Sequence, residues 1–258
     1  MKRLWIIRYS LMKGFRQTLI GVNFLTLYSM STRRPFRKLY FIIPVLILTG
    51  IVLAIALRLT FVLQVFSFDS TANAPTIPAG RVVLTSNLSK PKLFDFIVFQ
   101  NSTQPGSPIW ISRLCGKAGD SIEIRSGDLF VNGRPVDSLL TLSHSYVVFP
   151  KDTAGMNVKE MAAVPLTFDS VDNMVITYPD QLMRQKDITY RRFIVPQEIA
   201  DAHVQKIFNQ PWNLDHFGPV TVPADSYFVL GDNRSNAIDS RYIGFIRKKD
   251  FKGTVLRY

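Results

Sequence analysis

The chain of 258 residues lacks several features that would suggest a function directly. Its single cysteine, Cys115, excludes an intramolecular disulfide framework. Its three histidines have no spacing typical of metal ligands, and no internal repeat or low-complexity tract is present. No aspartate or glutamate precedes Asp69, although ten lysines or arginines lie in that stretch. Most of the net charge of +12 therefore belongs to one end of the chain.

This uneven charge indicates what kind of partner the chain has. A pI near 9.9 would suggest nucleic acid if the charge covered a folded face. Here it lies ahead of Leu39 to Leu57, nineteen uncharged residues that are close to the length of a membrane-spanning helix. Basic residues accumulate on the cytoplasmic side of a membrane. We therefore expect a lipid bilayer rather than nucleic acid as partner, and a single-pass anchor over residues 39–66 with the N-terminus inside.

The segment before the anchor, residues 1–38, is basic and is expected to be cytoplasmic or interfacial. Within it, residues 4–28 mix apolar and aromatic side chains with Arg8, Lys13 and Arg16. This composition is typical of an amphipathic helix that lies on anionic lipid. A second membrane span over these residues is the alternative.

Short β-like runs separated by turn residues follow the anchor. The Ser126-Gly127-Asp128 turn and the Asn132-Gly133 pair are hairpin signals. This pattern predicts a mainly β fold in which a transmembrane helix precedes an exported, coiled β-sheet domain. The sheet domain is expected to comprise residues 67–137 and 211–258.

The pattern loosens between these two parts, which predicts an inserted α+β subdomain over residues 138–210. Stretches near Met156–Ala163 and Pro196–Phe208 tolerate helix, whereas Met174–Tyr178 is typical of a strand.

Residues 231–246 carry more information than any other stretch, because two aspartates and two arginines directly follow the apolar run Tyr227–Leu230. Charges so close to a β-like run are unfavourable unless they pair. We therefore expect ion pairs that fix the sheet around a cleft, with the following residues forming a structural box: Asp232, Asn233, Arg234, Asp239, Ser240 and Arg241.

The order Gly231-Asp232-Asn233-Arg234, then Asp239-Ser240-Arg241, then Gly244-Phe245 resembles the last conserved box of bacterial type I signal peptidases. The resemblance implies a serine endopeptidase that removes signal peptides without a cofactor or metal. In that family a serine in a Ser-Met-x-Pro-Thr box is the nucleophile, and the lysine of a Lys-Arg-x-x-Gly-x-x-Gly-Asp box is the base. A lysine can serve as base when apolar surroundings lower its pKa, and an adjacent base activates the serine hydroxyl.

Both boxes have counterparts here, but neither has its catalytic residue. In Ala72-Asn73-Ala74-Pro75-Thr76 the nucleophile position is Ala72, and in the box that runs from Ser112 to Asp120 the base position is Ser112. The position of a serine that supports the lysine is Ala237, while Ser70 matches a hydroxyl that helps to bind the oxyanion. The resemblance therefore predicts a membrane-anchored signal peptidase homologue that lacks the dyad. Such a pseudoenzyme would lie in the bacterial inner membrane with its C-terminal domain in the periplasm, and would bind exported precursors or an active signal peptidase.

Two alternatives remain at this point. One is an active peptidase with a relocated dyad, in which Ser70 or Thr71 is the nucleophile and Lys117 the base. Lys117 lies five positions after Ser112, however, and an odd offset on a strand reverses the side-chain face, with a turn at Gly116 moving it further. The other alternative is a structural envelope protein whose cleft is closed.

Overall fold

The computed structural model describes residues 37–59, 62–100, 106–149, 156, 162–163 and 174–258. Residues 4–28, with their predicted interfacial helix, lie outside the described residues. Helix α1 (Arg37–Leu59) contains the predicted apolar run, and its window Tyr40–Leu57 has a mean hydropathy of 2.7. This helix is long and apolar enough to cross a membrane. Pro44 lies within it, as is tolerated in transmembrane helices.

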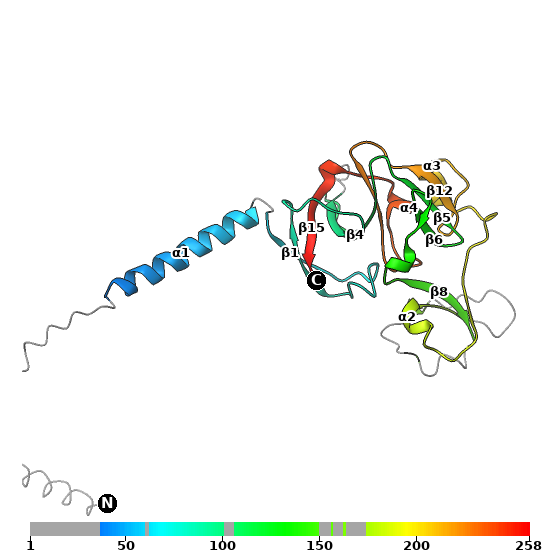
Figure 1. Ribbon diagram of the computed structural model, residues 1–258, viewed down its shortest axis with the longest axis horizontal. Coiled ribbons are helices and arrows are strands. Elements are labelled where there is room, and N and C mark those ends of the chain that lie inside the picture. Colours follow the sequence, from blue (N-terminus) through cyan, green and yellow to red (C-terminus); the bar gives the residue numbers. More distant parts are fainter. Residues whose placement is uncertain (1–36, 60–61, 101–105, 150–155, 157–161, 164–173) are drawn as a thin grey trace, which may run out of the picture. The chain divides into compact units, whose positions relative to one another are not determined.

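The largest sheet after α1 is a curled, antiparallel sheet of seven strands (Figure 1). Its strands are, in spatial order, β1 (Gln64–Phe68), β2 (Arg81–Ser86), β15 (Phe251–Arg257), β3 (Phe96–Gln100), β4 (Ile109–Lys117), β13 (Ser226–Leu230) and β14 (Ile246–Arg247). The predicted mainly β fold is thus confirmed.

Both faces of this sheet are covered near its centre. On β3, Phe96 and Val98 pack into one hydrophobic cluster, while Ile97 and Phe99 pack into another on the opposite face. All four side chains are buried because alternate residues of a strand point to opposite faces. The uninterrupted apolar run Phe96–Phe99 is therefore typical of a strand with a core on either side.

A second sheet contains both predicted hairpins. Its strands follow the order β12 (Phe217–Thr221), β5 (Ser121–Arg125), β6 (Asp128–Val131) and β7 (Arg134–Pro135). Ser126 and Gly127 both have positive φ, as do Asn132 and Gly133, and this conformation suits two-residue hairpin turns. Ile122, Ile124, Leu129 and Val131 form part of the hydrophobic core beneath this sheet.

The predicted insert contains a third sheet with its own hydrophobic cluster. Its strands follow the order β11 (Tyr190–Arg192), β8 (Ser143–Val148), β10 (Met174–Pro179) and β9 (Ala162–Ala163), and the short helix α2 (Asp180–Met183) follows β10. The helical interpretation of Met156–Ala163 is wrong at Ala162–Ala163, because these residues pair with β10. Strand pairing outweighs the helix propensity of alanine there.

Helix α3 (Ala202–Phe208) begins at the side chain of Asp201, which accepts the backbone N–H groups of His203 and Val204. Val204 and Phe208 pack on the core beneath the second sheet rather than on the cluster of the insert. The remaining described helices are η1 (Asp137–Leu139), α4 (Ser240–Ile243) and η4 (Lys248–Asp250). Of these, α4 contacts α3.

Candidate functional site

The loop that carries Ala72 is joined directly to the 231–246 box. The backbone N–H of Asn233 donates to the Ala72 carbonyl at 3.0 Å, and its side-chain amide donates to the Thr71 carbonyl at 3.2 Å. The hydroxyl of Thr76 donates to Asp232 at 2.5 Å. Two segments about 160 positions apart in the chain are therefore held together by three hydrogen bonds.

Asp232 is fixed by a buried bidentate pair with Arg113 of β4. Its two carboxylate oxygens accept Arg113 Nε at 2.6 Å and Nη2 at 2.5 Å, and its side chain is 1% exposed. Bidentate arginine–carboxylate pairs fix orientation as well as distance. Since removing one member of a buried pair leaves an uncompensated charge, this pair determines where the box lies against β4.

Two further buried pairs complete the box. Arg241 donates to Asp239 at 2.9 and 2.7 Å, and Asp239 also caps α4. Arg234 pairs with Asp137 of η1 at 2.7 Å. These three pairs, which we call the ion-pair frame, consist of Arg113–Asp232, Asp137–Arg234 and Asp239–Arg241.

The sequence predicted that the charges of the box pair with one another, and the structure brings only Asp239 and Arg241 together in this way. The partners of Asp232 and Arg234 come from other segments, as Arg113 and Asp137. Arg113 could have been suspected from its place in the box beginning at Ser112. No comparable signal in the sequence points to Asp137.

The three positions that the resemblance assigns to catalysis gather around Gly231. Leu230 pairs with Arg113, so Gly231 and Ser112 are the next residues along these two strands. A Cβ atom at Gly231 would lie 2.5 Å from the Ala72 carbonyl oxygen and closer still to the Cβ of Ala237. Glycine is therefore needed at 231 to let the Ala72 loop and the Ala237 segment approach.

The Ser112 side chain is turned toward its own strand. It is 2% exposed, and its hydroxyl donates to the Ile111 carbonyl at 2.7 Å. The amide of Asn73 donates to the same carbonyl at 2.8 Å. Ser112, at the family's base position, and Asn73, directly after the nucleophile position, thus both donate to the Ile111 carbonyl of β4.

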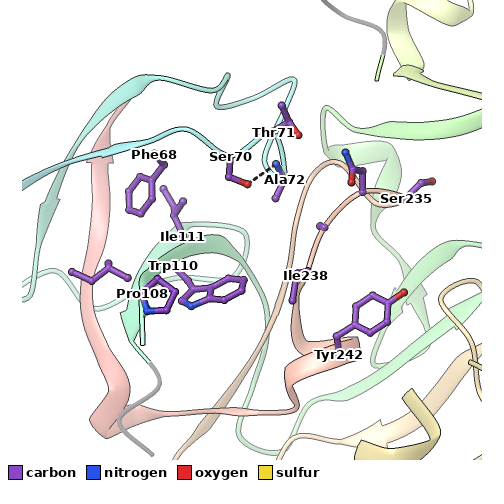
Figure 2. Close-up of a pocket in the computed structure, with 13 residues that line it drawn as sticks. Phe68, Ser70, Thr71, Ala72, Pro108, Trp110, Ile111, Ser235, Ile238 and Tyr242 are labelled. Carbon is purple, nitrogen blue, oxygen red and sulfur yellow. Dashed lines mark hydrogen bonds between the residues drawn. The ribbon is translucent and has the colours of Figure 1, made fainter. Parts of the chain in front are cut away.

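A cleft of about 540 Å³ is lined by Ala72 and Ala237, whereas Ser112 does not line it (Figure 2). Figure 2 shows Phe68, Trp110 and Ile111 on one wall and Ile238 with Tyr242 on the other. Among the described residues that line this cleft there is no lysine, histidine, aspartate or glutamate. Burial, with Asp201 nearby, raises the pKa of Tyr242 to about 12, so its phenol stays protonated at neutral pH.

Hydroxyl groups are present in the cleft, at Ser70 and Thr71 beside Ala72. The Ser70 oxygen accepts the backbone N–H of Ala72 at 3.2 Å, as Figure 2 marks. Ser70 is exposed, so its hydroxyl hydrogen is able to point into the cleft. The loop therefore presents a polar group that can donate to a bound carbonyl.

Lys117 is the last residue of β4, five residues after Ser112. The prediction that this odd offset puts the two side chains on opposite faces of the strand is wrong. Phe228 pairs with Gly116 and Val229 with Leu114, so Cys115 is an extra residue, and Gly116 lies within the strand rather than in a turn. Such a bulge puts Lys117 on the same face as Leu114 and Ser112. Lys117 is kept from Ser112 by distance, because five residues of a strand span about 16 Å at ~3.3 Å per residue. Lys117 does not line the cleft.

The cleft walls themselves were not identified from the sequence. Phe68 and Trp110 lie outside any motif, whereas Ile238 and Tyr242 lie in the 231–246 box between residues that were singled out for their charge. The fold brings them together, because the end of β1, the start of β4 and the segment that leads into α4 meet at this cleft.

A curled antiparallel sheet with a cleft at the end of its edge strand is a scaffold to which an extended peptide can add as a further strand. Comparison with known proteins identifies the family. Residues 41–258 match the model of the signal peptidase family, peptidase S26. The chain belongs to this family, as the resemblance of its boxes predicted.

Individual proteins of this family are similar to the chain as follows. Signal peptidase I of Buchnera aphidicola (Acyrthosiphon pisum) is 23% identical, over 95% of this chain and 84% of that protein. Signal peptidase I P of Bacillus subtilis subsp. natto is 26% identical, over 77% of this chain and 80% of its own. The crystal structure of a signal peptidase I from Enterococcus faecalis matches 64% of this chain and 97% of its own, at 21% identity and a TM-score of 0.31.

Proposed function

We propose that this protein is a membrane-anchored signal peptidase homologue that binds exported peptides without cleaving them. The observation that carries the proposal is the composition of the cleft, where the described lining residues include hydroxyl groups but no base. A serine or threonine hydroxyl is a weak nucleophile at neutral pH unless an adjacent base takes its proton. Ser70 and Thr71 are therefore not activated by any described residue of the cleft.

Binding is supported by the shape and position of the same cleft. Its volume falls within the range of about 300–1,000 Å³ that is usual for ligand sites. Strand β1 is an edge strand of the seven-stranded sheet, and its last residue, Phe68, lines the cleft. An extended peptide can add to such an edge through main-chain hydrogen bonds while its side chains enter the cleft.

The proposed ligands are the signal-peptide regions of exported precursors, or an active signal peptidase that presents its own extended segment. Helix α1 supports an anchor in the bilayer, and the basic residues before it support an N-terminus on the cytoplasmic side. The sheet domain would then lie outside, in the periplasm, where exported precursors emerge.

The test uses the full-length protein in lipid nanodiscs and a fluorescent precursor peptide with an Ala-x-Ala site. We expect the fluorescence anisotropy to rise on binding and mass spectrometry to find the peptide intact. Ile238→Asp should weaken binding at least tenfold, because it places a charge in an apolar wall of the cleft. Ile199→Asp is the matched control, since Ile199 is 57% exposed against 56% for Ile238 and does not line the cleft.

Cleavage of the peptide by the unaltered protein, abolished by Ser70→Ala or Thr71→Val, would favour the relocated dyad and contradict the proposal. Equal binding by the two isoleucine variants would place the peptide elsewhere. Absence of binding would favour a purely structural protein.

A further inference from the structure

A buried histidine lies where the insert joins the 231–246 box, outside the cleft. Strand β8 forms a parallel bridge to the box at Ser143 and Asn233. Ser143 N–H donates to the Asp232 carbonyl, and Arg234 N–H donates to the Ser143 carbonyl, both at 3.0 Å. Ser145 N–H donates to the Ser235 hydroxyl at 2.9 Å. These three hydrogen bonds, which we call the junction, come from the residues on either side of His144.

The His144 ring is held from one side only. Its Nδ1 lies 2.8 and 2.9 Å from the two carboxylate oxygens of Asp180, and its side chain is 4% exposed. Asp180 also accepts the hydroxyl of Tyr146 at 2.8 Å. The Nε2 atom is buried and makes no hydrogen bond with any described residue. A neutral ring that donates from Nδ1 therefore fits this site.

A protonated ring fits it poorly. Protonation adds a second N–H at Nε2, where no described acceptor lies, and an unsatisfied buried donor is unfavourable. The charged and titratable groups around the ring are Asp180 of α2, Tyr146 of β8, Tyr178 of β10, Arg192 of β11, and Arg234 of the box with its partner Asp137. Asp137 is paired with Arg234, and the two arginines repel an imidazolium, so Asp180, which already accepts from Nδ1, is the one carboxylate among these groups that favours the charged ring.

We infer that His144 is a pH-sensitive latch, which holds the insert to the box while its ring is neutral and releases the junction when its ring is protonated. Ser235 accepts a junction hydrogen bond and also lines the cleft, so opening of the junction frees one wall of the peptide site. Histidine is the side chain suited to such a switch between pH 5 and 8.

The direction of the effect follows from linkage. Burial, partly offset by the hydrogen bond to Asp180, lowers the pKa of His144 below its ordinary value of about 6.5. The neutral ring therefore stabilises the closed junction above pH 6.5, and this stability is lost as the pH falls below 6.5. The opening constant should rise up to about tenfold per pH unit until the folded pKa is reached.

Protonation of Asp180 does not account for a loss of stability between pH 6.5 and 5. Burial alone would raise the pKa of Asp180, but the hydrogen bonds from His144 and Tyr146 outweigh it and hold the pKa below its ordinary value. The carboxylate therefore stays charged between pH 7.5 and 5, so a change in this interval reports on the ring.

Amide hydrogen exchange of the full-length protein in nanodiscs, measured from pH 7.5 to 5.0 and corrected for the intrinsic rate, tests the inference without any peptide ligand. We expect protection at Ser143, Ser145 and Arg234 to fall below pH 6.5, by up to tenfold per pH unit, while Leu114 in β4 keeps its protection. His144→Gln, which can still donate to Asp180 but does not titrate, should remove this pH dependence. His203→Gln, at an exposed histidine, should leave it unchanged.

A second measurement leaves His144 untouched. The chain has three histidines, so the double variant His203→Gln/His216→Gln retains His144 alone, and its ring signals in NMR are assigned directly. We expect these signals to report a neutral ring that titrates below 6.5. Titration at or above 6.5, or junction protection that does not change with pH, would overturn the inference. Because neither readout needs a peptide, such a failure is distinct from failure of the proposed function.

Discussion

The ion-pair frame and the cleft above it differ in how their side chains are paired. Each charge of the frame faces an opposite charge at hydrogen-bond distance, and these side chains are at least 85% buried. The cleft has hydroxyl groups at Ser70 and Thr71 and no base among its described lining residues.

This difference shows that the groups that fix the geometry are separate from the groups that would perform the reaction. A buried ion pair tolerates the loss of one member poorly, because the other charge remains unpaired. Side chains that line an open cleft contribute less to folding, since few of their contacts are lost when they change. A scaffold of this kind can therefore keep its shape without a catalytic dyad.

Restoring the catalytic groups should give the largest effect. The triple variant Ala72→Ser/Ser112→Lys/Ala237→Ser places a nucleophile, a base and a supporting hydroxyl around Gly231. A lysine at position 112 would be buried, and burial lowers the pKa of an ammonium group toward neutrality. We expect cleavage of an Ala-x-Ala peptide to rise by on the order of 10³-fold or more over the unaltered protein, measured by mass spectrometry. In a serine protease, loss of nucleophile or base costs about 10⁶ in turnover.

The two variants that each lack one member of the dyad, Ala72→Ser/Ala237→Ser and Ser112→Lys/Ala237→Ser, are the controls and should stay inactive. If the triple variant folds and binds the peptide but does not cleave it, the frame alone does not provide catalytic geometry. The hydrogen bond from Asn73 to Ile111 would then be the next contact to change, because it occupies the space beside position 112.

Breaking the frame should give the next largest effect. Asp232→Asn leaves the buried Arg113 without its charged partner, which costs about 3–5 kcal/mol for a buried pair. This loss corresponds to a fall in melting temperature of roughly 10 °C for a domain of this size. Asp225→Asn, in the exposed pair with Lys248, is the matched control and should leave thermal unfolding unchanged. Equal melting curves for the two variants would contradict the role given to the frame.

Much of this fold could be predicted from the sequence, because its signals are local. The uncharged run Leu39–Leu57 specifies a helix by length and polarity alone. The pairs Ser126-Gly127 and Asn132-Gly133 specify hairpins because both residues of each turn adopt positive φ. The 231–246 box identified the family since it keeps charges and glycines in a fixed order.

The rest depends on contacts between distant segments. Asp137 pairs with Arg234 across nearly a hundred positions, and neither neighbourhood indicates the other. The extra residue at Cys115 changes the side-chain parity of β4, and only the pairing with β13 reveals it. The cleft walls could not be predicted for the same reason, because the curl of the sheet brings them together.

A smaller effect is expected where the frame meets the cleft. Gly231→Ala introduces a Cβ that overlaps the Ala72 carbonyl oxygen and the Ala237 side chain, so a backbone segment must shift. Overpacking of this kind costs about 1–3 kcal/mol. We expect lower stability in urea together with weaker peptide binding, because the Ala72 loop moves. Gly50→Ala, where a Cβ meets no atom within 4 Å, is the control and should change neither.

The smallest effect should come from the cleft alone. Ser70→Ala removes the acceptor of the Ala72 N–H and a donor for a bound carbonyl, while water can replace both at this exposed loop. A single hydrogen bond contributes about 0.5–1.5 kcal/mol, so peptide affinity should fall roughly two- to tenfold and stability should not change. Fluorescence anisotropy and urea unfolding measure the two quantities separately. If Ser70→Ala instead abolishes a cleavage activity of the unaltered protein, the cleft contains a nucleophile after all. The contrast between a frame of paired charges and a cleft whose described lining residues include no base would then fail as an account of function.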